Sequence, residues 1–129
     1  MAAHFWFDLF VFLNVLILTL LALNISRLRI SEKVANGDGN NVELKKAIRA
    51  HGNGVEHVVV FALLILALES GSAPSTLLAA LVGVFTLGRL AHAAGMLGSF
   101  FNLRRLGAVT TYLLELAALA GVLRYCLLG

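Results

Sequence analysis

A cation, an amide and a carboxylate precede an uninterrupted apolar stretch near the middle of the chain. Arg49, Asn53 and Glu56 are spaced i, i+4 and i+7, so they share one face of a helix. The apolar run 58–68 follows them, which puts the three groups at the mouth of a membrane helix. Polar groups at membrane depth are costly unless they find partners inside a bundle. The spacing therefore predicts a site for a bound polar ligand.

Other apolar segments add polar side chains at the same end of the predicted bundle. These residues are Arg27, Arg89, His92, Arg104, Arg105 and Tyr112. Guanidinium groups bind carboxylates in bidentate fashion, and the carboxylate of Glu56 can take an ammonium group. The residue types together favour an anionic, peptide-like ligand.

The composition indicates a membrane protein. The chain has 129 residues, of which 60% are hydrophobic and 13% charged, and its mean hydropathy is +0.91. A soluble domain is about 25% charged. The single cysteine, Cys126, excludes an internal disulfide, and the four histidines lack the spacing of a zinc site. We therefore expect no metal.

Four apolar segments predict an all-α, antiparallel four-helix transmembrane bundle that occupies residues 1–129 as one domain. The expected helices are residues 5–28, 44–69, 75–97 and 106–128. Glycine- and asparagine-rich residues 36–40 predict the first turn. Pro74 with Ser75 predicts the start of the third helix.

The basic residues predict the orientation of the bundle. Lys and Arg gather in the first and third loops and at the helix ends beside them. The positive-inside rule then puts those loops in the cytoplasm and both termini on the non-cytoplasmic side of an integral, multi-pass protein. The net charge of +3 fits this topology and contact with membrane lipids. No motif for nucleic acid is present, and we expect no such partner.

Several motifs, taken together and in order, carry a family resemblance. Arg49-Ala-His-x-Asn-x-x-Glu56, Gly88-Arg-x-x-His92, Arg27-Leu-Arg29 and Thr111-Tyr112 resemble the MAPEG family, the membrane-associated proteins of eicosanoid and glutathione metabolism. The resemblance covers essentially the whole chain. It is strongest to the branch of microsomal prostaglandin E synthase and microsomal glutathione transferase.

The resemblance implies a homotrimer of four-helix subunits that binds glutathione between neighbouring subunits near the cytoplasmic side. The positions that match glutathione contacts in the family are Arg27, Asn53, Glu56, His92 and Tyr112. Arg49 and Arg89 match arginines that support this set. Asp38 falls near an acidic residue that assists the chemistry of the prostaglandin synthase.

The resemblance also directs attention to the residue that activates the thiol. Ala108 and Val109 stand where the synthase has its activating arginine and the adjacent serine. Arg105 is therefore the first candidate for thiol activation and Arg104 the second, while Tyr112 is a possible hydrogen-bond donor to sulfur. A nearby guanidinium favours the thiolate, which is the nucleophile.

The expected function is that of a glutathione-dependent membrane enzyme. Its thiolate would attack a lipophilic electrophile, a peroxide or a prostaglandin endoperoxide that arrives from the bilayer. The alternatives are a non-catalytic lipid-binding protein of the same fold and, with less support, a small four-helix transporter.

Structural interpretations of the same residues stay open. Glu56 could pair with Arg49 or Arg89 between helices, and Arg104-Arg105 could anchor the chain at the membrane surface. The sequence favours His57 at the membrane interface and allows Glu115 at a subunit interface.

Overall fold

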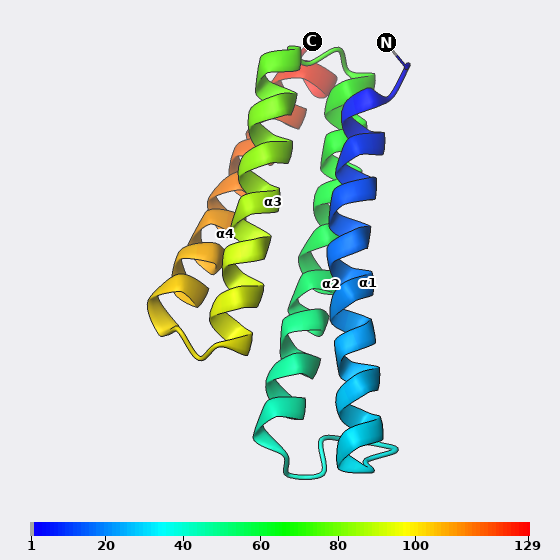
Figure 1. Ribbon diagram of the computed structural model, residues 1–129. Coiled ribbons are helices and arrows are strands. Elements are labelled where there is room, and N and C mark those ends of the chain that lie inside the picture. The colour runs from blue at the N-terminus through cyan, green and yellow to red at the C-terminus, as the bar shows by residue number, and fades with distance from the viewer. Residues whose placement is uncertain (1) are drawn as a thin grey trace.

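The computed structural model describes residues 2–129, which form four long antiparallel helices (Figure 1). Their bounds are Phe5–Glu32 for α1, Val42–Ser70 for α2, Ser75–Leu97 for α3 and Phe101–Val122 for α4, which the π-helix η1, Leu123–Leu127, continues. Helix α1 packs on α2 and α3 packs on α4, while α2 also contacts α3 and α4. Both ends of the chain lie beside the α2–α3 turn, and the α1–α2 loop is at the opposite end (Figure 1).

All four helices are long and apolar enough to cross a membrane. The mean hydropathies of their most apolar windows lie between 1.6 and 2.4. Large apolar side chains such as Phe12, Leu63, Leu87 and Leu116 are exposed on the outside of the bundle. The predicted class, an all-α four-helix membrane bundle, is confirmed.

An aromatic cluster fills the bundle near the end that carries the termini. Phe61 of α2 stacks on Phe85 of α3 with ring centroids 4.0 Å apart. Phe10 of α1 contacts both rings, at 5.6 and 5.3 Å. Nearby, the Asn14 amide donates a buried hydrogen bond to Thr86 Oγ1 over 3.0 Å. This packing joins α1 to α2 and α3.

The first two helices are slightly longer than predicted. Helix α1 continues to Glu32. It ends there because the next residue, Lys33, has a left-handed backbone, and the Lys33 N–H donates to the carbonyl oxygen of Arg29. Helix α2 begins at Val42 because the Asn41 side chain accepts a hydrogen bond from the Leu44 N–H over 2.9 Å. The bounds of α3 are those that the sequence predicts.

Helix α4 begins five residues earlier than the predicted residue 106, at Phe101. The reason is a close approach of two backbones, since a Cβ on Gly95 would collide with the backbone of Arg104. The α3–α4 connection therefore needs only residues 98–100. Arg104 and Arg105 consequently lie within the first turns of the helix.

A carboxylate near the end of α2 caps the start of α1. Glu69 accepts hydrogen bonds from the N–H groups of Trp6 and Phe7, over 3.0 and 2.9 Å. These N–H groups have no partner within their own helix, and the negative charge also favours the helix N-terminus. The contact closes the termini end of the bundle.

Candidate functional site

A buried arginine joins three helices at the centre of the polar region. Arg89 of α3 is 3% exposed and its Nη2 donates to Asn53 Oδ1 of α2 over 2.6 Å. Its Nη1 donates to Thr111 Oγ1 of α4 over 3.3 Å, and Nη2 also lies 3.4 Å from His92 Nδ1. We call Asn53, Arg89, His92 and Thr111 the polar cluster.

Glycines let α3 and α4 approach closely enough to form this cluster. A Cβ on Gly107 would lie 2.5 Å from the carbonyl oxygen of Gly88 and from the backbone nitrogen of His92. Small residues at such crossings allow membrane helices to pack backbone to backbone. The crossing brings the Arg89 guanidinium to Thr111, which in turn donates to the Gly107 carbonyl over 2.9 Å.

Three predicted ligand-binding residues face outwards beside the cluster. Arg49 and Glu56 of α2 form an ion pair of 3.7 Å between Nη1 and Oε1, with side chains 56% and 58% exposed. Tyr112 of α4 is 57% exposed, so it is not a core residue of the chain. Of the two structural partners considered for Glu56, the structure shows Arg49. An exposed pair of this kind contributes little stability by itself.

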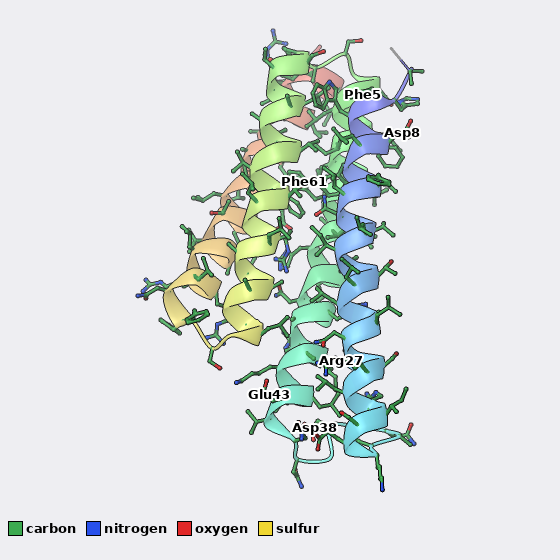
Figure 2. All side chains as sticks on the ribbon, in the orientation of Figure 1. Phe5, Asp8, Arg27, Asp38, Glu43 and Phe61 are labelled. Atoms are coloured by element: carbon green, nitrogen blue, oxygen red, sulfur yellow. The ribbon has the colours of Figure 1, made fainter. Side chains whose placement is uncertain are left out.

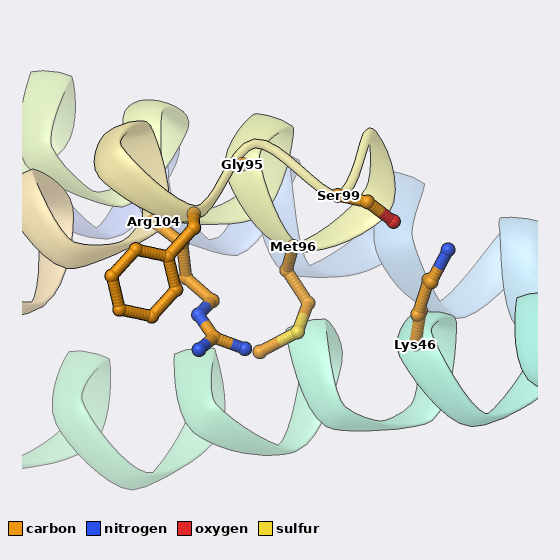
Figure 3. Close-up of a pocket in the computed structure, with 6 residues that line it drawn as sticks. Lys46, Gly95, Met96, Ser99 and Arg104 are labelled. Atoms are coloured by element: carbon orange, nitrogen blue, oxygen red, sulfur yellow. The ribbon is translucent and has the colours of Figure 1, made fainter.

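A basic groove opens between α2 and the α3–α4 turn. Its volume is about 380 Å³, and its lining residues are Val42, Lys45, Lys46, Arg49, Met96 and Arg104. A smaller neighbouring pocket of about 190 Å³ continues it past Gly95 and Ser99. Figure 3 shows the Arg104 and Met96 side chains extending toward each other, with Lys46 at the other end of this pocket. The Arg104 guanidinium also lies 5.3 Å from the centre of the Phe101 ring.

Three predicted site residues lie outside this region. Arg105 is exposed on α4. Arg27 is exposed on α1, where it donates to Asn24 Oδ1 over 2.9 Å. Asp38 lies in the α1–α2 loop at the far end of the hairpin (Figure 2), where its carboxylate accepts a hydrogen bond from the Asn40 N–H.

The remaining predicted residues converge. The structure brings together Arg49, Asn53, Glu56, Arg89, His92, Arg104 and Tyr112 along the adjoining faces of α2, α3 and α4. The arrangement offers cations at the groove, an amide and an imidazole in the middle, and a carboxylate with a phenol on the outer face. Among residues 2–129, no group of three or more His, Cys, Asp or Glu side chains is placed to hold a metal ion.

The sequence analysis missed a polar pair in the same region. His57 of α2 and Glu115 of α4 contact each other through Nδ1 and Oε1 at 2.7 Å, with side chains only 13% and 17% exposed. The sequence analysis placed His57 at the membrane interface and Glu115 at a subunit interface, and it did not expect the two side chains to pair within one chain. The available signal was that Glu115 lies one turn from Thr111 and Tyr112, on the face of α4 that carries the site.

These features define an integral, multi-pass membrane protein with a polar site inside a four-helix bundle. The sequence pattern of the MAPEG family matches residues 8–124, and the chain belongs to that family. The protein "Inner membrane protein YecN" of Escherichia coli strain K12 is 36% identical over 104 residues, covering 81% of this chain and 79% of that protein. The protein of the same name from Escherichia coli O6:H1 matches equally well. That name states a location and no activity, and no solved structure matches the chain.

Proposed function

We propose that this chain binds glutathione and activates its thiol for attack on a lipophilic electrophile or peroxide from the bilayer. The observation that carries the proposal is the convergence of the predicted ligand set on α2, α3 and α4, centred on the Arg89–Asn53 contact of 2.6 Å. Membership of the MAPEG family supports it, because glutathione-dependent enzymes belong to that family.

The chemistry of the region matches the groups of glutathione. The tripeptide carries two carboxylates, one ammonium group and one thiol. Arg49 and the basic groove offer guanidinium and ammonium groups for the carboxylates. The exposed carboxylate of Glu56 offers a partner for the ammonium group. Complementary charge of this kind fixes both the position and the orientation of a ligand.

A homotrimer would complete the site. Arg49, Glu56 and Tyr112 are exposed beside apolar residues of α2, and lipid is a poor environment for charged groups. Arg27 is a predicted glutathione contact, yet within its own chain it bonds Asn24 of the same helix. Both facts favour a neighbouring subunit that covers this face and brings its own Arg27 to the ligand.

The placement of the arginines on α4 bears on thiol activation. Arg104 lines the basic groove, whereas Arg105 is exposed. This geometry gives Arg104 more support than Arg105 as the guanidinium that stabilises the thiolate.

The topology that we propose puts the basic groove and the α1–α2 loop on the cytoplasmic side and both termini on the other side.

A non-catalytic lipid-binding function is the second candidate, and one observation favours it. An apolar groove of about 330 Å³ lies between α1 and α3. Its walls are Ile17, Leu20, Leu21, Asn24, Leu90, Ala93, Ala94 and Leu97. A groove of this composition fits an acyl chain. Its lining contains neither Arg89 nor His92 of α3.

Calorimetric titration of glutathione into the detergent-solubilised protein tests the proposal. Wild type should bind, and Asn53→Ala and Glu56→Gln should each weaken binding by about 1–3 kcal/mol, because a polar or charged partner is left unpaired. Glu32→Gln is the control, since Glu32 is an exposed carboxylate at the end of α1 and does not line the basic groove. No binding by wild type, or equal binding by all variants, would refute the proposal.

A further inference from the structure

The His57–Glu115 pair is a close and largely buried polar contact that has no role in the proposed binding of glutathione. In the tautomer that donates Nδ1–H to the carboxylate, the second ring nitrogen of His57 is a hydrogen-bond acceptor. Within residues 2–129 the hydrogen bond of the His57 ring is the one that Nδ1 makes with Glu115. A carboxylate on one side of an imidazole holds its orientation and stabilises the imidazolium that forms when the other nitrogen takes a proton.

The pair lies beside the residue that the family resemblance puts near the sulfur. The His57 ring packs edge-on against the Tyr112 ring, with centroids 5.2 Å apart and planes at 88°. His57 follows Glu56 directly in α2, and its side chain is 13% exposed, so it lies inside the outer face that carries Glu56. Tyr112 is exposed, and a ligand that reaches its ring comes close to the imidazole.

Thiol activation needs a proton acceptor, and arginine does not provide one. A guanidinium keeps its charge and has no acceptor atom, so it stabilises a thiolate without taking the proton. The position that corresponds to the activating arginine of the synthase is Ala108. The proton must therefore pass to another side chain or to the solvent.

We infer that His57, held by Glu115, accepts the thiol proton of the bound glutathione, an assignment that rests on the proposed function. The S–H bond breaks, an N–H bond forms on His57 Nε2, and the Glu115 carboxylate balances the new positive charge. The thiolate then forms a bond to the electrophilic carbon. The proton on Nε2 passes to the anionic product or leaving group, which restores neutral His57.

The charged groups around His57 explain why Glu115 is needed. His92 of α3 and Tyr112 of α4 lie near His57, and Glu56 precedes it in α2. Arg89 contacts His92, and the Glu115 carboxylate acts on the charge of Arg89 as well. Arg89 opposes a second positive charge in this region, whereas the Glu115 carboxylate at 2.7 Å offsets it. Without that carboxylate, we expect the imidazole to take the proton poorly.

The test combines two measurements on glutathione bound to the detergent-solubilised full chain. Ultraviolet absorbance reports the thiolate, and calorimetry in two buffers of different ionisation heat reports the protons released on binding. In wild type, thiolate should form at neutral pH while almost no proton reaches the buffer, because His57 keeps it. His57→Gln and Glu115→Gln should each reduce the bound thiolate at least tenfold while affinity changes less than threefold, the tenfold step being about 1.4 kcal/mol.

Controls and contrary results separate this inference from the function on which it rests. His51→Gln, a histidine six residues earlier in α2, should behave as wild type. Unchanged thiolate in His57→Gln and Glu115→Gln, or release of one proton to the buffer by wild type, would overturn the inference and leave glutathione binding intact. No glutathione binding by wild type would overturn both. If His57→Gln does not fold, Glu115→Gln carries the same two readouts.

Discussion

Arg89 and Asn53 form a 2.6 Å hydrogen bond that joins α3 to α2. Inside a membrane bundle, little water is available to replace this bond. Arg89 also donates to Thr111, so one side chain holds three helices. Lysine keeps the charge but lacks the planar fork that reaches both partners. Arg89→Lys should therefore lower the free energy of unfolding by about 1–3 kcal/mol.

Thermal unfolding in detergent, followed by far-ultraviolet circular dichroism, measures this effect. Arg105→Lys is the control, because Arg105 is exposed on α4 and the same substitution there should change little. Equal stability of the two variants would show that the Arg89 contacts do not hold the helices together.

The α3–α4 crossing depends on Gly107. Gly107→Ala places a methyl group 2.5 Å from the Gly88 carbonyl oxygen and from the His92 nitrogen, so the helices must separate. Overpacking of this kind costs about 1–3 kcal/mol, more than the helix propensity that alanine adds. Gly83→Ala is the matched control, because a Cβ there meets nothing within 4 Å. A melting temperature for Gly107→Ala at or above that of Gly83→Ala would contradict the crossing.

The termini end of the bundle depends on Glu69. Glu69→Ala removes the acceptor for the Trp6 and Phe7 N–H groups and should destabilise the protein by about 1 kcal/mol. The fluorescence of Trp6, the only tryptophan, reports local opening of α1. Glu43→Ala at the other end of α2 should leave this fluorescence unchanged, and an equal response from both variants would argue against the cap.

The local sequence predicted what depends on local patterns. The class of fold, the bounds of α3 and the shared face of Arg49, Asn53 and Glu56 follow from hydropathy, from Pro74 and from helical spacing. The start of α4 could not be predicted, because its N-cap residue, Phe100, makes no side-chain cap and the close packing of Gly95 against Arg104 is a contact between helices.

Contacts between residues that are distant in the chain could not be predicted from the sequence either. His57 and Glu115 are 58 residues apart, and Asn14 and Thr86 are 72 apart. No periodicity within one helix identifies the partner on another, because the rotation of each helix about its axis is set by packing. The outward placement of Arg105 follows from the rotation of α4, which the early start of the helix and the Gly107 crossing determine.

Substitution of the two arginines at the start of α4 should affect the thiolate fraction of bound glutathione differently. Arg104→Ala should reduce the thiolate fraction of bound glutathione, because Arg104 lines the basic groove and contributes positive potential there. Arg105→Ala should have a smaller effect, because its side chain is exposed. Thiolate absorbance at constant ligand saturation compares them. A loss confined to Arg105→Ala would reverse the assignment and restore the order that the sequence alone favours.

Native mass spectrometry of the detergent-solubilised protein with glutathione tests the central claim most directly, because it reads subunit number and bound ligand in one spectrum. We predict a trimer that carries one glutathione for each subunit, and a lower ligand occupancy for Glu56→Gln at the same glutathione concentration. Monomers alone, or a folded wild-type trimer that binds no glutathione, would contradict the account.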